Sequence, residues 1–264
     1  NHESKLKNGS CGAGFLLDKG VKTTICDSDS FDFEVTSGDD TVIRAVLDIL
    51  NLKETNFKVI QDIELPIGAG FGTSAASALS LTLALNEFLD LNYPEELCGQ
   101  IAHMAEVNLG AGLGDVIAQT GKGLVLRTKP GAPGIGEIES YECGAYIGYK
   151  TFGSIETSDI ICDPHHKKVI SEAGLKYLDL FKQEPTLDKF LEFSKKFSSE
   201  TKLICEDVQR EIDYFNSIDD ILGSSMAMLG NTVFALSYNK STFKNLGIDN
   251  LHVDKLNNDG IVYD

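Results

Sequence analysis

Apolar and polar residues alternate along residues 57–65, which is typical of a strand with one buried face. Residues 75–89, by contrast, are apolar on nearly every side over a length too great for a strand, so they predict a buried helix. Between them, residues 66–74 begin with a proline that ends the strand and carry glycine at three alternate positions. The pattern therefore predicts a strand, a glycine-rich loop and a buried helix in direct succession.

The rest of the N-terminal half contains short apolar runs and helical apolar spacing. We expect strands at residues 10–17 and 21–26, joined as a hairpin through the turn Asp18-Lys19-Gly20. Further elements are predicted at these positions: helix 41–50, helix 94–107, short helix 115–119 and strand 124–127. Glycine and proline then crowd residues 130–136, which predicts a loop.

The C-terminal half is mostly helical in its first part and richer in strand patterns near its end. A short strand at residues 145–149 opens it, and we place a domain boundary near residues 141–145. Apolar spacing predicts these further elements: helices 164–182, 186–199 and 201–222, two strands within 224–236 about a Gly230-Asn231 turn, and closing strands at 251–253 and 261–263. The whole pattern predicts an α+β fold with two domains, residues 1–143 and residues 144–264.

Composition favours a globular protein of the cytoplasm. The chain has 264 residues, 42% of them hydrophobic, and lacks the unbroken apolar tract of about 18 residues that spans a membrane. Acidic residues outnumber basic ones by 40 to 23, and the net charge of −17 disfavours nucleic acid and anionic membranes as partners. Six scattered cysteines without a C-x-x-C pair predict reduced thiols and no zinc site. No secretory leader precedes this pattern, and we expect the natural start to lie upstream of Asn1.

The glycine-rich loop has the properties of an anion-binding site. Gly68, Gly70 and Gly72 allow a tight turn and bring backbone amides close to a ligand, because no Cβ blocks the approach. Ser74 lies at the start of the predicted helix, where the first N–H groups lack intrahelical partners and the helix dipole is positive. We therefore expect the loop to cradle phosphate.

Other interpretations of this loop fit its residues less completely. A Walker loop requires Lys and then Ser or Thr after its last glycine, whereas Thr73-Ser74 follow Gly72 directly. A dinucleotide fingerprint requires glycine at position 73, although Asp90 does lie about 20 residues further on, as such a site needs. A purely structural tight turn is also consistent with the glycines.

Two candidate carboxylates flank a second glycine loop at residues 108–114. Glu106 lies three residues after His103 on the preceding helix, so the two side chains can address the same small volume. Asp115 opens the next short helix, nine residues after Glu106. Alternatively, His103 and Glu106 belong to a solvated helix face, and Asp115 is an N-cap that bonds free amides of the first turn.

The motif Pro66-x-Gly68-x-Gly70-x-Gly72-x-Ser74-Ala75 resembles the second motif of the GHMP kinases, which include galactokinase, homoserine kinase, mevalonate kinase and phosphomevalonate kinase. The resemblance implies ATP-dependent phosphorylation of a small alcohol, with Mg²⁺ as cofactor. It implies a two-domain GHMP kinase fold, with an N-terminal domain like domain 2 of ribosomal protein S5 and a ferredoxin-like C-terminal domain of helices and sheet. By this resemblance the nucleotide is bound by the whole loop: Pro66, Gly68, Ala69, Gly70, Phe71, Gly72, Thr73 and Ser74.

Three further stretches are similar to the archaeal pantoate kinase branch of that superfamily: residues 7–14, 102–116 and 226–234. The resemblance implies that Ser74 and Glu106 hold Mg²⁺ and that Asp115 faces the substrate hydroxyl. It also implies that Ser10, His103 and Arg127 hold pantoate, and the planar guanidinium of Arg127 suits a carboxylate. The alternative for His103 is a buried structural histidine. The implied reaction transfers the γ-phosphoryl group of ATP to the terminal hydroxyl of pantoate, giving 4-phosphopantoate for coenzyme A biosynthesis.

The sequence departs from that branch in places. Cys11 stands where a basic residue is expected, the stretch at Gly230 is poorer in glycine than the third motif of many members, and the family's first motif is absent. Alternatives are a kinase for homoserine, mevalonate or a sugar, a GHMP-fold protein that binds without catalysis, and a nicotinamide-dependent oxidoreductase, which predicts parallel βαβ units. The sequence does not indicate the oligomeric state, and a homodimer is compatible with it.

Overall fold

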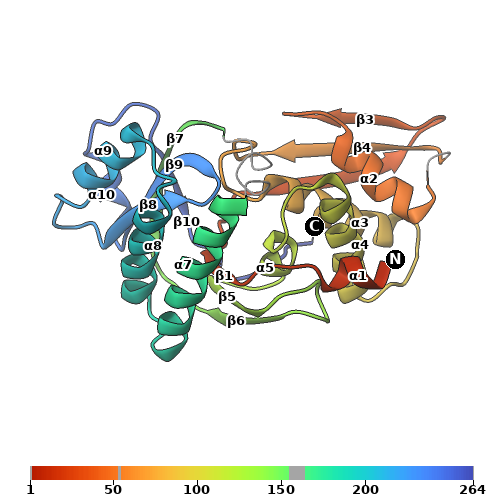
Figure 1. Cartoon of the computed structure of the whole chain (residues 1–264). Helices are drawn as coiled ribbons and strands as arrows, with labels where there is room; N and C mark the ends of the chain where they lie inside the picture. The colour runs from red at the N-terminus through yellow and green to blue at the C-terminus, as the bar shows by residue number, and fades with distance from the viewer. Residues whose placement is uncertain (1, 53–54, 155–163, 264) are drawn as a thin grey trace.

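The computed structural model describes residues 2–52, 55–154 and 164–263, which form an N-terminal and a C-terminal half lying side by side (Figure 1). The elements of the N-terminal half are α1 (His2–Lys7), β1 (Gly12–Phe15), β2 (Val21–Asp27), β3 (Asp32–Val35), α2 (Thr41–Leu50), β4 (Phe57–Ile63), α3 (Thr73–Phe88), α4 (Glu95–Leu109), α5 (Asp115–Gln119), β5 (Leu124–Lys129) and β6 (Glu137–Tyr141). Those of the C-terminal half are β7 (Tyr146–Ser154), α7 (Pro164–Gln183), α8 (Leu187–Thr201), α9 (Glu206–Phe215), β8 (Gly223–Ala227), β9 (Gly230–Ser237), α10 (Lys240–Lys244) and β10 (His252–Lys255). Helices and strands are mixed without regular alternation, so the fold is α+β, as predicted.

Helix α3 is the centre of the N-terminal half. Nine of its 16 residues are buried, because α2, α4 and strand β2 all pack against it. Because other elements cover several faces of α3, its sequence is apolar on nearly every side. Strands β2, β4 and β3 form a three-stranded sheet in that order, and a second sheet has the order β1-β5-β6.

A buried polar cluster fixes α3 against strand β4. The amide nitrogen of Gln61 donates to Thr23 Oγ1 at 2.9 Å and to the carbonyl of Ser77 at 3.0 Å. The hydroxyl of Ser77 in turn donates to Gln61 Oε1 at 2.6 Å. A slip of α3 along the sheet would leave these buried groups unpaired, which is costly, so the start of α3 has a defined position.

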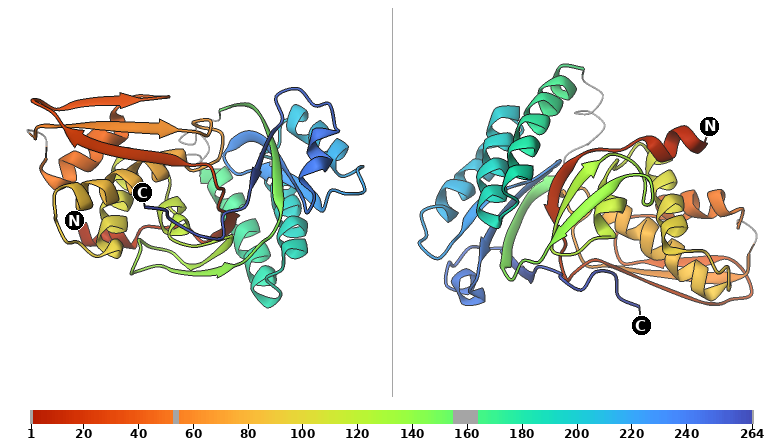
Figure 2. Two further views of the ribbon diagram at one scale, coloured as in Figure 1. Left: turned by 180° about the vertical axis from the view of Figure 1, so that it is seen from behind. Right: turned by 90° about the horizontal axis from the view of Figure 1, so that it is seen from below.

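The C-terminal half is an antiparallel sheet, in the order β10-β7-β9-β8, with helices on both faces. Alternate residues of β9 point to opposite faces, as the pleat requires. Phe234 and Leu236 join the core formed with α7 and α8, whereas Val233 and Ala235 join the core formed with α9 and α10. Figure 2 shows the C-terminal tail returning to the N-terminal half, where the hydroxyl of Tyr263 donates to Glu95 at 2.9 Å.

The expected hairpin of residues 10–17 and 21–26 was wrong, although both strands exist. Strand β1 pairs with β5 and strand β2 pairs with β4, so consecutive strands enter different sheets. The intervening turn is held from outside: the amide of Lys19 donates to Asp254 and that of Gly20 to Glu64. These partners are distant in sequence, and no local pattern reveals them.

Other differences are smaller. Strands β3 and β6 and helix α10 were not predicted, and neither was helix α1, because the polar residues 1–10 indicated a loop. Helix α9 is shorter than the expected 201–222, and residues 261–263 form no strand. The turn between β8 and β9 lies at Met228-Leu229, where Leu229 has a φ of 63°, rather than at Gly230-Asn231. The cysteines among the described residues are free thiols: Cys11, Cys26, Cys98, Cys143 and Cys205. Along the part of the chain that the structure covers, no helix has both the length and the apolar character of a membrane span.

Candidate active site

A cleft of about 1590 Å³ is lined by residues of both halves. Its lining includes the glycine-rich loop, the start of α3 and residues 111–115 from the N-terminal half. The C-terminal half contributes residues of α7, α8 and the turn between β8 and β9. The cleft is large enough for a nucleotide and a second small molecule.

The glycine-rich loop has the backbone shape that its sequence predicts. Gly68, Gly70 and Gly72 have φ values of 70°, 87° and 63°, a conformation that residues with a Cβ rarely adopt. The carbonyl of Gly72 accepts the first hydrogen bond of helix α3, from the amide of Ala76 at 3.0 Å. The amides of residues 73–75 precede that bond and lie at the positive end of the helix dipole, so they suit an anion.

The loop is in backbone contact with the C-terminal half. A Cβ at Gly70 would lie 2.9 Å from the carbonyl oxygen of Ala227, and one at Gly230 would lie 2.1 Å from the carbonyl carbon of Ala69. Neither position has room for a side chain. Glycine at both positions therefore allows the loop and the β8–β9 turn to meet directly.

Ser74 and Glu106 form a short hydrogen-bonded pair at the start of α3. The hydroxyl of Ser74 donates to Glu106 Oε1 at 2.5 Å, and the amide of Gly112 donates to Oε2 at 3.1 Å. Glu106 is only 1% exposed, and burial raises the pKa of its carboxyl above the ordinary value, as does the charge of Asp115 to a smaller extent. The two hydrogen bonds oppose this rise without cancelling it. The helix-face alternative is therefore wrong for Glu106, which is buried.

Asp115 lies beside the same pair. A Cβ at Gly112 would lie 2.6 Å from Asp115 Oδ2 and 3.1 Å from Glu106 Oε2, so both carboxylates lie against this glycine. A Cβ at Gly72 would lie 3.3 Å from Asp115 Cβ, which places Asp115 next to the start of α3. The N-cap residue of α5 is Gly114, and Asp115 is the first residue of the helix, so the N-cap interpretation of Asp115 is wrong. Ser74, Glu106 and Asp115 all line the cleft.

Ser10 and Arg127 are neighbours, and both lie against Gly114. The Nε of Arg127 donates to the carbonyl of Ser10 at 3.3 Å. A Cβ at Gly114 would lie 2.4 Å from Ser10 Oγ and 2.8 Å from Arg127 Nε. Both residues line the cleft, and among the described residues no carboxylate pairs with Arg127. A guanidinium without an anionic partner, at the edge of a cleft, suits a carboxylate ligand.

Three of the predicted site residues do not line the cleft: Pro66, Ala69 and His103. His103 is 1% exposed, and its Nε2 lies 3.3 Å from the carbonyl oxygen of Lys5. Burial lowers the pKa of this imidazole. The geometry thus gives His103 a role in docking α1 on α4, and direct contact with a substrate finds no support here.

Sequence reasoning missed Gln119, which also lines the cleft and whose amide nitrogen donates to the carbonyl of Gly72 at 2.9 Å. Its place four residues after Asp115 on one short helix was the available signal. The aromatic lining from α7 and α8 was missed as well, because those helices offered no motif: Tyr177, Phe181, Phe190, Phe193 and Phe197.

The side chains present fit Mg²⁺ bound together with a polyphosphate. No cluster of three or more His, Cys, Asp or Glu side chains suited to a metal occurs among the described residues. Mg²⁺ does not require one, since it commonly takes one or two protein oxygens and completes its shell with water and phosphate. The Ser74 hydroxyl and the Glu106 carboxylate supply such oxygens next to the anion-binding amides.

Comparisons with known proteins agree with this geometry. Residues 40–123 match the model of the GHMP kinases N terminal domain, which spans the glycine-rich loop, Glu106 and Asp115. A solved structure described as a phosphotransferase related to the CoA biosynthesis pathway is 28% identical, with a TM-score of 0.80 over 98% of this chain and 90% of that one.

Two curated relatives also match most of the chain. The pantoate kinase of Methanocaldococcus jannaschii is 35% identical over 89% of this chain and 86% of its own. That of Thermococcus kodakarensis is 32% identical over 89% of this chain and 81% of its own. The chain therefore belongs to the GHMP kinases, in the family of these two pantoate kinases.

Proposed function

We propose that this protein transfers the γ-phosphoryl group of ATP to the terminal hydroxyl of pantoate, giving 4-phosphopantoate and ADP in coenzyme A biosynthesis. The observation that carries the proposal is the placement of two carboxylates, Glu106 and Asp115, against Gly112 at the cleft beside Ser74. The curated relatives named pantoate kinase and the CoA-related phosphotransferase support the choice of acceptor.

The nucleotide phosphates would lie on the amides of residues 68–75, at the start of α3. The positive φ values of the three glycines leave these amides accessible to a ligand, and the helix dipole favours the negative charge of the phosphates. Pro66 and Ala69 support the loop without lining the cleft. Ser74 and Glu106 would hold Mg²⁺, which when bound neutralises the charge of the phosphates.

Asp115 would orient the attacking hydroxyl and accept its proton. A carboxylate of this kind acts best when the acceptor is held in line with the phosphate, so binding of the acceptor is part of catalysis. Arg127 would grip the pantoate carboxylate with two hydrogen bonds, and Ser10 beside it would bond a polar group of the same molecule. His103 would not touch pantoate but would dock α1 on α4 through the carbonyl of Lys5.

The two-domain division at residues 1–143 and 144–264 belongs to this proposal. The N-terminal domain would supply the phosphate cradle, Glu106 and Asp115, while the C-terminal domain would cover the cleft with α7, α8 and the β8–β9 turn. Covering the cleft excludes water, which protects the phosphoryl group from hydrolysis. We further propose that the enzyme works in the cytoplasm without nucleic acid or membrane partners.

The test measures steady-state ADP release with ATP and three acceptors: pantoate, homoserine and mevalonate. We expect turnover on pantoate alone. Asp115→Asn should lower kcat by about 10²–10⁴ while nucleotide binding, followed by thermal shift, is retained. Asp249→Asn, a change of the same chemistry on the exposed surface, is the control and should leave kcat unchanged. Turnover on another acceptor would reject pantoate, and normal turnover by Asp115→Asn would reject the role of that carboxylate.

A further inference from the structure

Gln119 joins the helix that carries Asp115 to the loop that cradles phosphate. On α5 (Asp115–Gln119) the two side chains are four residues apart, and so they share one face of the helix. Both lie against Gly72: a Cβ there would be 3.1 Å from Gln119 Nε2 and 3.4 Å from Asp115 Cγ. The hydrogen bond from Nε2 to the Gly72 carbonyl, 2.9 Å long, spans 47 positions of sequence.

The orientation of the Gln119 amide is determined by this carbonyl. If the oxygen and nitrogen of the amide were exchanged, two oxygens would face each other at hydrogen-bond distance. The amide oxygen, Oε1, is then buried without a hydrogen-bond partner among the described residues. The hydrogen bond to the Gly72 carbonyl is therefore the interaction that sets the orientation of this amide.

The carbonyl of Gly72 receives two hydrogen bonds. One comes from the amide of Ala76 within α3 and the other from Gln119 on α5. Together they fix the plane of the peptide that follows Gly72, and hence the direction of the free amides in the first turn of α3. They also set the separation between Asp115 and Ser74, since each lies within a few residues of one of the two donors.

We propose that Gln119 is a positioning residue for phosphoryl transfer, which holds Asp115 at a fixed distance from the phosphate cradle through the Gly72 carbonyl. The proposal rests on the reaction proposed above. Gln119 acts on the geometry of the reacting groups, so its loss lowers kcat and leaves the affinity for ATP nearly unchanged.

The main test compares Gln119→Met with Gln100→Met. Methionine has nearly the shape of glutamine but neither donates nor accepts strongly. Gln100 is the matched control, because its Nε2 makes a similar bond, 3.0 Å long, to the carbonyl of Pro133 outside the cleft. We expect Gln119→Met to lose about 10- to 100-fold in kcat with a KM for ATP within about twofold, and Gln100→Met to keep its kcat. A wild-type kcat in Gln119→Met, or an equal loss in Gln100→Met, would overturn the proposal.

A second variant, Gln119→Glu, tests the hydrogen bond itself through the pH dependence of kcat, which a purely structural role of Gln119 would leave unchanged. A protonated carboxylic acid can donate to the Gly72 carbonyl, whereas the ionised form can only repel it. The ratio of the Gln119→Glu kcat to the wild-type kcat should therefore rise as pH is lowered. A ratio that does not change with pH contradicts the proposed hydrogen bond.

Failure of the reaction assignment is distinguishable from failure of this inference. Absence of wild-type turnover on pantoate rejects the acceptor, and the variants are then compared on whichever acceptor the wild-type enzyme uses. Amide hydrogen exchange needs no acceptor at all: exchange at Ala76, whose amide donates to the Gly72 carbonyl, should be about tenfold faster in Gln119→Met than in Gln100→Met. Equal exchange in the two variants rejects the positioning role.

Discussion

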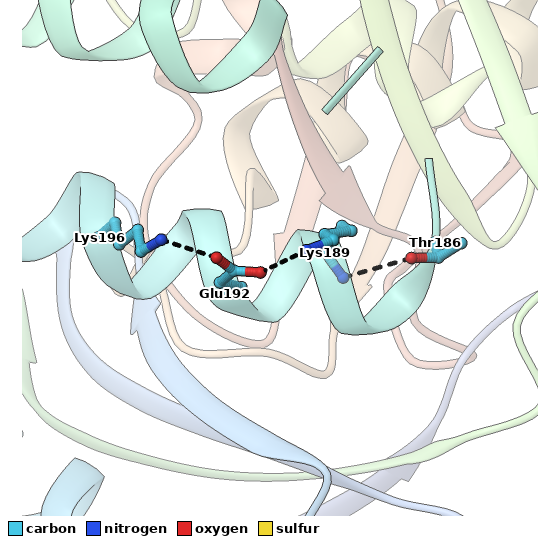
Figure 3. Close-up of polar contacts among 4 residues, drawn as sticks. All are labelled: Thr186, Lys189, Glu192 and Lys196. Atoms are coloured by element: carbon cyan, nitrogen blue, oxygen red, sulfur yellow. Dashed lines mark hydrogen bonds and ion pairs between the residues drawn. The ribbon is translucent and has the colours of Figure 1, made fainter. Parts of the chain in front are cut away.

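Glu106 on α4 and Glu192 on α8 each accept two hydrogen bonds, yet their surroundings act on them in opposite ways. Glu192 lies on the exposed face of α8, where Lys196 donates at 2.7 Å and Lys189 at 2.9 Å (Figure 3). These bonds lower the pKa of Glu192 to about 2. Glu106 accepts from a serine hydroxyl and a backbone amide, and burial raises the pKa of its carboxyl despite them.

The difference distinguishes Glu192, a member of a surface ion-pair network, from Glu106, a buried carboxylate at the cleft. Both partners of Glu192 are lysines one turn away on the same helix, and water and salt screen their charges. Among the described residues no cation bonds to Glu106, and Asp115 lies near it instead, so its negative charge is not compensated within the described protein. A pair of carboxylates at a cleft, uncompensated and with one member buried, is suited to attract a cation, which an already paired surface carboxylate is not.

The largest effect is expected from removing the charge of Glu106, with the same change at Glu192 as the control. Glu106→Gln should lower kcat by about 10²–10³, because the amide keeps the shape but loses the negative charge next to the phosphates. Glu192→Gln makes the same change on the surface, and its kcat should stay within about twofold of wild type. Steady-state ADP release on pantoate measures both. Equal losses of kcat in the two variants would contradict a special role for the charge of Glu106.

A smaller effect is expected from a methyl group placed between the two carboxylates. In Gly112→Ala the new Cβ meets Asp115 Oδ2 and Glu106 Oε2, so the carboxylates must move apart while both charges remain. We expect kcat to fall by about 10- to 100-fold. Gly144→Ala is the control, since nothing lies within 4 Å of its Cβ position, and stability there should change by less than about 0.5 kcal/mol. Unimpaired turnover in Gly112→Ala would show that the spacing of the carboxylates is not critical.

The smallest effect concerns stability as a function of pH, and its sign differs between the two positions. The raised pKa of Glu106 makes the native state bind the proton more tightly than the unfolded chain, so its contribution favours folding at low pH and is lost as pH rises above about 4.5. The lowered pKa of Glu192 stabilises the fold above about pH 4.5, and this stabilisation is lost as pH falls towards about 2.

Urea unfolding, with a chelator present, measures the free energy of unfolding as a function of pH. The free energy of unfolding of Glu106→Gln should increase relative to that of wild type as pH rises. The free energy of unfolding of Glu192→Gln should not increase relative to wild type as pH rises. If this variant is less stable than wild type, the difference should become smaller in high salt.

Local patterns predicted most helices and strands, and long-range pairing explains where they failed. Helix α2 and helix α5 have the predicted bounds, because apolar spacing and a glycine-rich boundary are local signals. The hairpin of β1 and β2 was wrong, since both strands find partners far along the chain, and no spacing of residues records which strand pairs with which.

The site was predicted to a similar extent. A motif placed Ser74, Glu106 and Asp115 near one another, and the geometry brings them together at one cleft. Their roles stay predictions until the variants are measured. His103 lies three residues from Glu106 but points to the carbonyl of Lys5, because helical spacing fixes which face a residue occupies and not which neighbour covers it. The spacing of Gln119 from Asp115 is visible in the sequence, but its partner, the backbone carbonyl of Gly72, is not.

The direct backbone contact between Gly70 and Ala227, and between Gly230 and Ala69, has a mechanical consequence. Because glycine supplies no side chain to absorb a displacement, a rotation of the C-terminal sheet would push or pull the glycine-rich loop. With the triphosphate bound at this loop, as proposed above, nucleotide binding and such a rotation would be coupled, and by reciprocity each would shift the other by the same free energy.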